Sequence, residues 1–171
     1  MYTMPNEPIV FDASTLILLA KVDLLGHVMR LWPIVATDTA ALEATRRKEL
    51  TDAQWIARAI ASGEIRVEPV PLDRTVRRLE ADFGIASGEA SSLALAHRRK
   101  RILATDDGRT IKACKVLRVP FATAIHFLID GRERRILSQP IALAKLERFS
   151  QIGWYGAEIL EDARRRLGGG K

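Results

Sequence analysis

Short apolar runs of strand length alternate along this chain with segments in which apolar residues recur at helical spacing. The first run is Pro8–Phe11, and Leu16, Leu19 and Val22 follow it at intervals of three residues. Alternation of this kind is typical of β–α–β units built around a parallel sheet. The sequence therefore predicts an α/β fold. Its predicted strands are Pro8–Phe11, Pro33–Ala36, Ile65–Val70, Ile102–Ala104 and Val119–Phe121.

Residue types typical of helix ends mark the segments between these strands. Thr37 or Asp38 suits the N-cap of one predicted helix. The cationic run His97–Arg101 suits the C-terminus of another, where the helix dipole favours positive charge. Apolar residues at helical spacing support each helix. The helices predicted before Asp130 contain Leu16–Val22, Ala41–Glu43, Thr51–Ala61, Asp73–Phe83, Ser87–Ala96 and Ile111–Val116.

After Asp130 the pattern is helical, with predicted helices at Ser138–Phe149 and Tyr155–Leu167. We therefore predict an α/β domain at residues 1–130 and a C-terminal helical extension at residues 131–171, packed on the same domain. The apolar faces of these helices could pack on the sheet, pair two subunits or receive a segment of a partner protein. Packing within the monomer is the default expectation, and a homodimer is also predicted.

Composition and charge narrow the class of protein. The chain has 171 residues, 47% hydrophobic and 28% charged, which excludes a disordered or collagen-like protein. Its 27 Lys and Arg against 21 Asp and Glu give a net charge of +6, a hint of polyanion binding. No apolar run could cross a membrane, Met1–Pro8 does not resemble a signal peptide, and the single Cys114 cannot form an internal disulfide. We expect a cytoplasmic protein without a membrane partner.

The three tryptophans, Trp32, Trp55 and Trp154, are predicted to lie in the core or at an interface. Surfaces that stack RNA bases usually present several exposed aromatic residues, and aromatic residues make up only 6% of this chain. The composition therefore does not indicate a stacking surface.

Acidic residues follow two of the predicted buried strands. Asp12 comes directly after the first strand, and Asp106 comes just after Ile102–Ala104. In an open parallel sheet the carboxyl ends of the strands form the ligand crevice, so both side chains are expected to point into one cleft. Glu43 and Glu89 lie on helices predicted to border the same edge. The sequence thus predicts a strongly anionic site.

A cluster of carboxylates needs protons or a cation. Two carboxylates about 4 Å apart repel by roughly 4 kcal/mol at an effective dielectric constant near 20. Ligation by oxygen alone favours Mg²⁺ or Mn²⁺ over zinc. In two-metal sites such ions activate water and stabilise both the attacking and the leaving oxygens of a phosphodiester. The predicted chemistry is the hydrolysis of nucleic acid.

The acids lie in the segments Ile9–Thr15, Glu43, Gly84–Ala90 with Leu93 and Ala96 behind, and Leu103–Asp107 followed by Arg109 and Ala113. In their order and in these residues, the segments resemble PIN domains. The resemblance implies a Rossmann-like three-layer α/β/α fold with a central parallel sheet, and a Mg²⁺- or Mn²⁺-dependent ribonuclease acting on RNA. Such proteins are often the VapC-type toxin of a toxin–antitoxin pair, with an antitoxin protein as partner. The helices after Asp130 exceed the usual PIN module and resemble those of a PIN-like subgroup.

The resemblance also assigns roles to individual residues. Either Asp106 or Asp107 could face the metal, and Asp106 is favoured by its distance from the strand. Arg109 could contact the scissile phosphate or pair with one of these two acids. The implied catalytic residues are Asp12, Glu43, Glu89 and Asp106, the metal ligands Asp12, Glu89, Asp106 and Asp107, and the substrate-binding residues Ser14 and Arg109.

Each acid also has a structural interpretation. Asp12 could cap the helix that begins near it, and Glu89 in the first turn of a helix would be stabilised by the helix dipole. Glu43 could form an ion pair with Arg46 or Arg47 at helical spacing. The two aspartates after the fourth strand could shape a turn.

Two other functions compete with the ribonuclease. A haloacid-dehalogenase-type phosphatase would use Asp12 as a nucleophile, but it needs a second Asp two residues later, where this chain has Ser14. The other is a non-catalytic PIN-like module that binds RNA or a protein and keeps its acids only for folding. Binding of Mn²⁺ that is lost in Asp12→Asn would favour the enzyme over the module.

Overall fold

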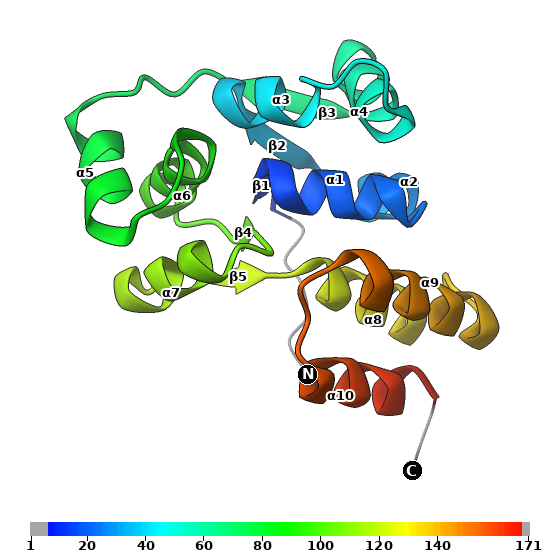
Figure 1. Cartoon of the computed structure of the whole chain (residues 1–171). Coiled ribbons are helices and arrows are strands. Elements are labelled where there is room, and N and C mark those ends of the chain that lie inside the picture. The colour runs from blue at the N-terminus through cyan, green and yellow to red at the C-terminus, as the bar shows by residue number, and fades with distance from the viewer. Residues whose placement is uncertain (1–6, 169–171) are drawn as a thin grey trace.

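A five-stranded parallel sheet forms the centre of the computed structural model, which describes residues 7–168 (Figure 1). Most of the Met1–Pro8 segment lies outside these residues. The strands have the order β3-β2-β1-β4-β5, so β1 is central and its Phe11 pairs with Ala36 on one side and Ala104 on the other. All strands being parallel, their carboxyl ends meet at one edge. The strands are β1 (Ile9–Phe11), β2 (Ile34–Thr37), β3 (Ile65–Glu68), β4 (Leu103–Ala104) and β5 (Phe121–Ala122).

Ten helices surround the sheet in residues 7–168, and two of them, α2 and α8, are absent from the sequence prediction. Helix α2 is short and has no side-chain N-cap. In α8 the buried residues Ile125, Phe127, Leu128 and Ile129 are almost consecutive in the sequence. Apolar residues therefore do not recur at the spacing of an amphipathic helix. The helices are α1 (Ala13–Lys21), α2 (Leu25–Leu31), α3 (Asp38–Ala44), α4 (Thr51–Ala61), α5 (Arg74–Phe83), α6 (Ser87–Arg99), α7 (Gly108–Leu117), α8 (Ala124–Glu133), α9 (Gln139–Ile152) and α10 (Ala157–Gly168).

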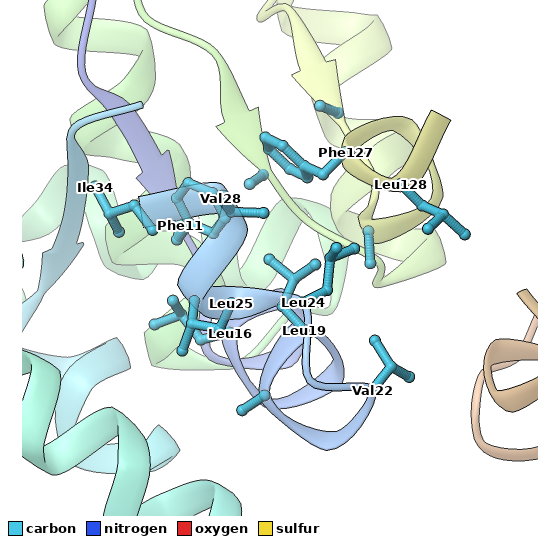
Figure 2. Packing of buried hydrophobic residues seen from close by; sticks show 14 of the residues in the cluster. Phe11, Leu16, Leu19, Val22, Leu24, Leu25, Val28, Ile34, Phe127 and Leu128 are labelled. Carbon is cyan, nitrogen blue, oxygen red and sulfur yellow. The ribbon is translucent and has the colours of Figure 1, made fainter. Parts of the chain in front are cut away.

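Alternate residues of the strands enter two separate cores. Phe11 faces the core formed with α1, α2 and α8, where its ring stacks on Phe127 with centroids 5.2 Å apart (Figure 2). Trp32 packs in the same core, with its ring edge-on to the ring of Phe127 and the two centroids 5.4 Å apart. Val10 faces the opposite core, which it shares with Leu93 of α6 and with residues of α5 and α7. The side-chain alternation of a strand thus produces the predicted three-layer α/β/α fold, which is confirmed.

The C-terminal helices α9 and α10 pack against the first core. Phe149 and Leu167 are buried in it. The Nζ atom of Lys145 donates hydrogen bonds to the backbone oxygens of Val22 (2.8 Å) and Asp23 (2.7 Å), just beyond the end of α1. Within residues 7–168, none of the helices combines the length and apolar character that crossing a membrane requires.

The three tryptophans differ in burial. Trp32 is 2% exposed, and Trp55 is half-buried against the first core. Trp154, between α9 and α10, is 103% exposed. The expectation of a core position is therefore wrong for Trp154.

Candidate active site

Asp12 lies at the carboxyl end of the central strand and caps α1. Its side chain is completely buried. Its Oδ1 accepts hydrogen bonds from the Thr15 amide (2.9 Å) and the Ser14 hydroxyl (2.8 Å), and the Thr105 hydroxyl donates to its Oδ2 (2.5 Å). The capping role is therefore present, and it fixes the carboxylate at the edge where the strands end.

Burial raises the pKa of Asp12 from 3.8 to about 7. The hydrogen bonds from Thr105, Thr15 and Ser14 lower the pKa, and the nearby charge of Asp106 raises it. Burial outweighs the three donors, so near neutral pH the carboxylate holds a proton or needs a neighbouring cation.

Glu43 and Glu89 lie near each other because a hydrogen bond connects the start of α3 to α6. The hydroxyl of Thr37, which accepts a hydrogen bond from the Ala40 amide (3.1 Å) at the start of α3, lies 2.9 Å from the hydroxyl of Ser91 in α6. A Cβ atom built on Gly88 would lie 2.5 Å from Oε2 of Glu43. The Glu43 carboxylate therefore rests on the first turn of α6, and the absence of a side chain at Gly88 makes room for it.

Glu89 experiences the charges of two other acids. Its Oε2 accepts a hydrogen bond from the Ala86 amide (2.6 Å), so it also caps the start of α6. Its pKa is raised first by burial and then by the charges of Asp107 and Glu43, while the Ala86 hydrogen bond and Arg109 lower it. Glu43, Glu89 and Asp107 thus form one group of acids, which we call the acidic side of the site.

Asp107 caps α7 with one oxygen. Its Oδ1 accepts hydrogen bonds from the Thr110 amide (2.7 Å) and the Thr110 hydroxyl (2.8 Å). In the described part of the chain no hydrogen bond reaches its Oδ2. This oxygen is therefore available to a ligand on the acidic side.

Asp106 is held on the other side of the same turn. Its Oδ2 accepts a hydrogen bond from the Thr15 hydroxyl (2.7 Å), and the Ala124 amide donates to both oxygens (3.0 and 3.2 Å). The Tyr155 hydroxyl donates to Oδ1. Burial raises the pKa of Asp106, and these hydrogen bonds lower it. We call Asp106, Thr15, Ala124 and Tyr155 the hydrogen-bonded side of the site.

The predicted substrate-binding residues have defined partners. The Ser14 hydroxyl bonds to Asp12 and lies 3.4 Å from the Asp106 amide, which donates to it. Nη1 of Arg109 donates to the Gly84 backbone oxygen (2.8 Å), beside Glu89. Among residues 7–168 Arg109 forms no ion pair with Asp106 or Asp107, so the pairing alternative is not supported.

The donor set fits a hard divalent ion. All the gathered groups are oxygen donors, and Asp12 and Glu89 each have a pKa raised by burial and by neighbouring carboxylates. As they stand, no three Asp, Glu, His or Cys side chains of residues 7–168 lie close enough to share one ion. The exposed side chain of Glu43 and the half-buried one of Glu89 extend from helices and can rotate towards an ion.

Sequence reasoning missed Thr15, Thr105 and Tyr155, which position the two aspartates. Thr105 could have been noticed, because a buried hydroxyl between a strand and an acid needs a partner. Tyr155 carries no such signal, because it lies 49 residues from Asp106 in the chain.

A separate cavity lies beside the edge strand β5, lined in part by Arg118, Phe121 and His126. It contains none of the predicted site residues.

Comparisons with known proteins agree with the fold. A family model described as DUF3368, PIN domain, matches residues 8–168. The crystal structure of PAE2754 from Pyrobaculum aerophilum is similar in fold, with a TM-score of 0.53 and 20% sequence identity, covering 72% of this chain and 96% of that one. No curated protein matches the chain. PIN domains are usually nucleases that use divalent metal ions. Because the family model covers nearly the whole chain, this protein belongs to the PIN domain family.

Proposed function

We propose that this protein is a metal-dependent endoribonuclease. The observation that carries the proposal is the acidic side, where the charges of Asp107 and Glu43 raise the pKa of Glu89. The Thr105 hydroxyl links this group to Asp12, because it donates to Asp12 and accepts a hydrogen bond from the Asp107 amide (3.3 Å). Four elements that are distant in the sequence supply these carboxylates. Their mutual repulsion gives a divalent cation a reason to bind there.

The roles follow from the surroundings of each side chain. Asp12, Glu89 and Asp107 would hold Mg²⁺ or Mn²⁺, with Glu43 assisting from α3. The bound ion supplies a Lewis acid for the phosphodiester and a means of activating water. The hydrogen bonds from Ser14 and from the two threonines orient Asp12.

Asp106 was predicted as a ligand and as a catalytic residue, and we propose a different role for it. Its two oxygens accept hydrogen bonds from Thr15, Ala124 and Tyr155, whereas Oδ2 of Asp107 accepts none from residues 7–168. We place Asp106 as a positioning residue and Asp107 as the ligand. Arg109, exposed beside Glu89, would bind a phosphate of the substrate.

RNA cleavage with Mn²⁺ or Mg²⁺ tests the proposal. The wild-type protein should cut RNA in either ion and stop in EDTA, and Asp12→Asn and Glu89→Gln should lose cleavage. Glu49→Gln is the matched control, because Glu49 is exposed and hydrogen-bonds to Arg47 away from the acids. Cleavage that persists in both site variants would contradict the carboxylate mechanism.

The non-catalytic PIN-like module is the other outcome of this experiment. Wild-type protein that cuts no RNA in Mn²⁺, and whose RNA binding is unchanged in Asp12→Asn, would favour the module. The phosphatase alternative has less support, because the Ser14 hydroxyl only orients Asp12 and the whole chain matches a PIN family model.

The finer predictions concern partners and location. The VapC-type toxin role, the antitoxin partner and the cytoplasmic location remain predictions drawn from the resemblance and the sequence. Sedimentation at micromolar concentration tests the predicted homodimer, because a single species of 19.1 kDa would contradict it.

A further inference from the structure

Trp154 has a large aromatic side chain that is fully exposed to solvent. It is 103% exposed, whereas Trp32 is 2% exposed. It lies in the short connection Gly153–Gly156 between α9 and α10, which Figure 1 shows beside the chain leaving β5. The proposed ribonuclease function gives this side chain no role so far.

The connection is anchored to the active site by the residue next to Trp154. The Tyr155 hydroxyl donates to Asp106, and its ring packs edge-on against Phe149 with centroids 5.9 Å apart. A Cβ atom on Gly153 would lie 2.5 Å from the Tyr155 ring and 2.9 Å from the Phe149 backbone oxygen, so this close packing requires glycine. Since neighbouring Cα atoms are about 3.8 Å apart, the indole begins one residue from the anchor. Trp154 is thus held at the margin of the site.

The charge of the extension favours a nucleic acid as the group that meets this indole. Residues 131–171 contain nine Lys and Arg against five Asp and Glu, a net charge of +4 out of +6 for the whole chain. Net positive charge together with an exposed aromatic ring is the combination that binds single-stranded nucleic acid, because cations attract phosphates and the ring stacks on a base. Four of these arginines also pair with acids, so the attraction comes from the net charge and not from a patch of free cations.

We propose that Trp154 is a stacking platform for an unpaired base of RNA that crosses the acidic site. The inference rests on the proposed ribonuclease function and adds that the substrate is single-stranded near the cut. In a duplex each base is already stacked between its neighbours, and its face is closed to the indole. A stacked base next to the Tyr155 anchor would hold the strand beside the turn that carries Asp106 and Asp107.

Binding of RNA without cleavage tests this platform. The probe is a short fluorescein-labelled single-stranded RNA of mixed sequence, with its duplex as comparison, measured by anisotropy in EDTA. Trp154→Ala should weaken single-strand binding by roughly 10-fold or more, and Trp154→Phe should retain most of it. Duplex binding should not change. Val116→Ala, which shortens another exposed apolar side chain on α7, is the control.

Each outcome separates this inference from the proposed function. Wild-type protein that cleaves RNA, together with Trp154→Ala that binds single strands as tightly as wild type, overturns the platform alone. Single-strand binding that depends on Trp154 without cleavage in Mn²⁺ overturns the ribonuclease and keeps the platform. A dimer that dissociates in Trp154→Ala with unchanged RNA affinity assigns the indole to a second copy and overturns the platform.

Discussion

The two aspartates that follow β4 are neighbours in the chain but have different surroundings. Asp106, on the hydrogen-bonded side, has donors on both oxygens from Thr15, Ala124 and Tyr155. Asp107, on the acidic side, uses one oxygen to cap α7 and adds its charge to that of Glu89. Residue type and position alone therefore do not decide which carboxylate binds a cation. The proposed choice of Asp107 over Asp106 rests on their different surroundings, and Mn²⁺ binding by the amide variants of both residues tests it.

Backbone geometry explains why the two side chains separate. Asp107 has φ −77° and ψ 124°, an extended conformation, at the N-cap of α7. Consecutive side chains of an extended segment point to opposite sides. One of the two acids can therefore face α6, and the other faces α8 and the C-terminal extension.

Exchanging each carboxylate for an amide of the same shape gives the largest expected effect. Asp107→Asn should lower the rate of RNA cleavage in Mn²⁺ by roughly 100- to 1,000-fold, because it removes a charge that would hold the ion. Asn is also a good N-cap, so the unfolding free energy should change little. Asp106→Asn should keep much of the rate and lose about 1–3 kcal/mol of unfolding free energy, because the amide nitrogen cannot accept the hydrogen bonds that one carboxylate oxygen accepts.

Urea unfolding of these two variants measures the change in unfolding free energy, and initial rates measure the change in RNA cleavage. Mn²⁺ affinity, measured by calorimetry with the metal alone, provides a readout independent of turnover. A loss of Mn²⁺ binding in Asp106→Asn with normal binding in Asp107→Asn would reverse the assignment of the two residues.

The pH dependence of the metal-free protein gives the next effect. The folded protein raises the pKa of Asp12 from 3.8 to about 7. The folded chain therefore binds more protons than the unfolded chain between about pH 4 and about pH 7, and the unfolding free energy falls as the pH rises through this window. The difference corresponds to at most about 4 kcal/mol.

Urea unfolding in EDTA at about pH 5 and about pH 8 measures this loss. Asp12→Asn should flatten it, since the amide does not titrate, and Asp52→Asn on the distant α4 should not. An equal fall in wild type and Asp12→Asn would show that other groups determine the pH dependence.

Gly88→Ala separates the role of Glu43 from the stability of α6. The new methyl group would lie 2.5 Å from Oε2 of Glu43, a flexible carboxylate that can move away. Cleavage should fall by roughly 10-fold as Glu43 is displaced. The unfolding free energy should stay the same or rise, because alanine favours the helix.

Gly108→Ala is the matched control for this variant. Gly108 begins α7 beside Asp107, and a Cβ atom there meets nothing within 4 Å. Normal cleavage in Gly88→Ala would remove Glu43 from the site.

The strands and the cap residues could be predicted from the sequence because they depend on short-range patterns. Apolar runs locate all five strands to within a few residues, and Asp12 and Glu89 follow from a strand end and a helix start. The helix α8 could not be predicted, because its nearly continuous burial removes the period on which the prediction depends.

The choice between Asp106 and Asp107 needed long-range contacts. It depends on the Thr15 hydroxyl, 91 residues away, and on Tyr155, 49 residues away. No local pattern marks either partner. The indole of Trp154 was missed for the same reason, because exposure is a property of the folded surroundings.

Tyr155→Phe gives the smallest expected effect and tests how far the extension supports the hydrogen-bonded side. Removing one hydroxyl that donates to a carboxylate should lower the unfolding free energy by about 1–2 kcal/mol. The ring remains to pack on Phe149, so the fold should be kept. Because Asp106 would still bind Thr15 and Ala124, kcat should stay near wild type, while KM for single-stranded RNA should rise modestly as the Trp154 connection loosens. Tyr2→Phe, the chain's other tyrosine, serves as the chemical control. A large fall in kcat at unchanged KM would show that the Tyr155 hydroxyl takes part in the reaction, and the separation between the two sides of the site would then be wrong.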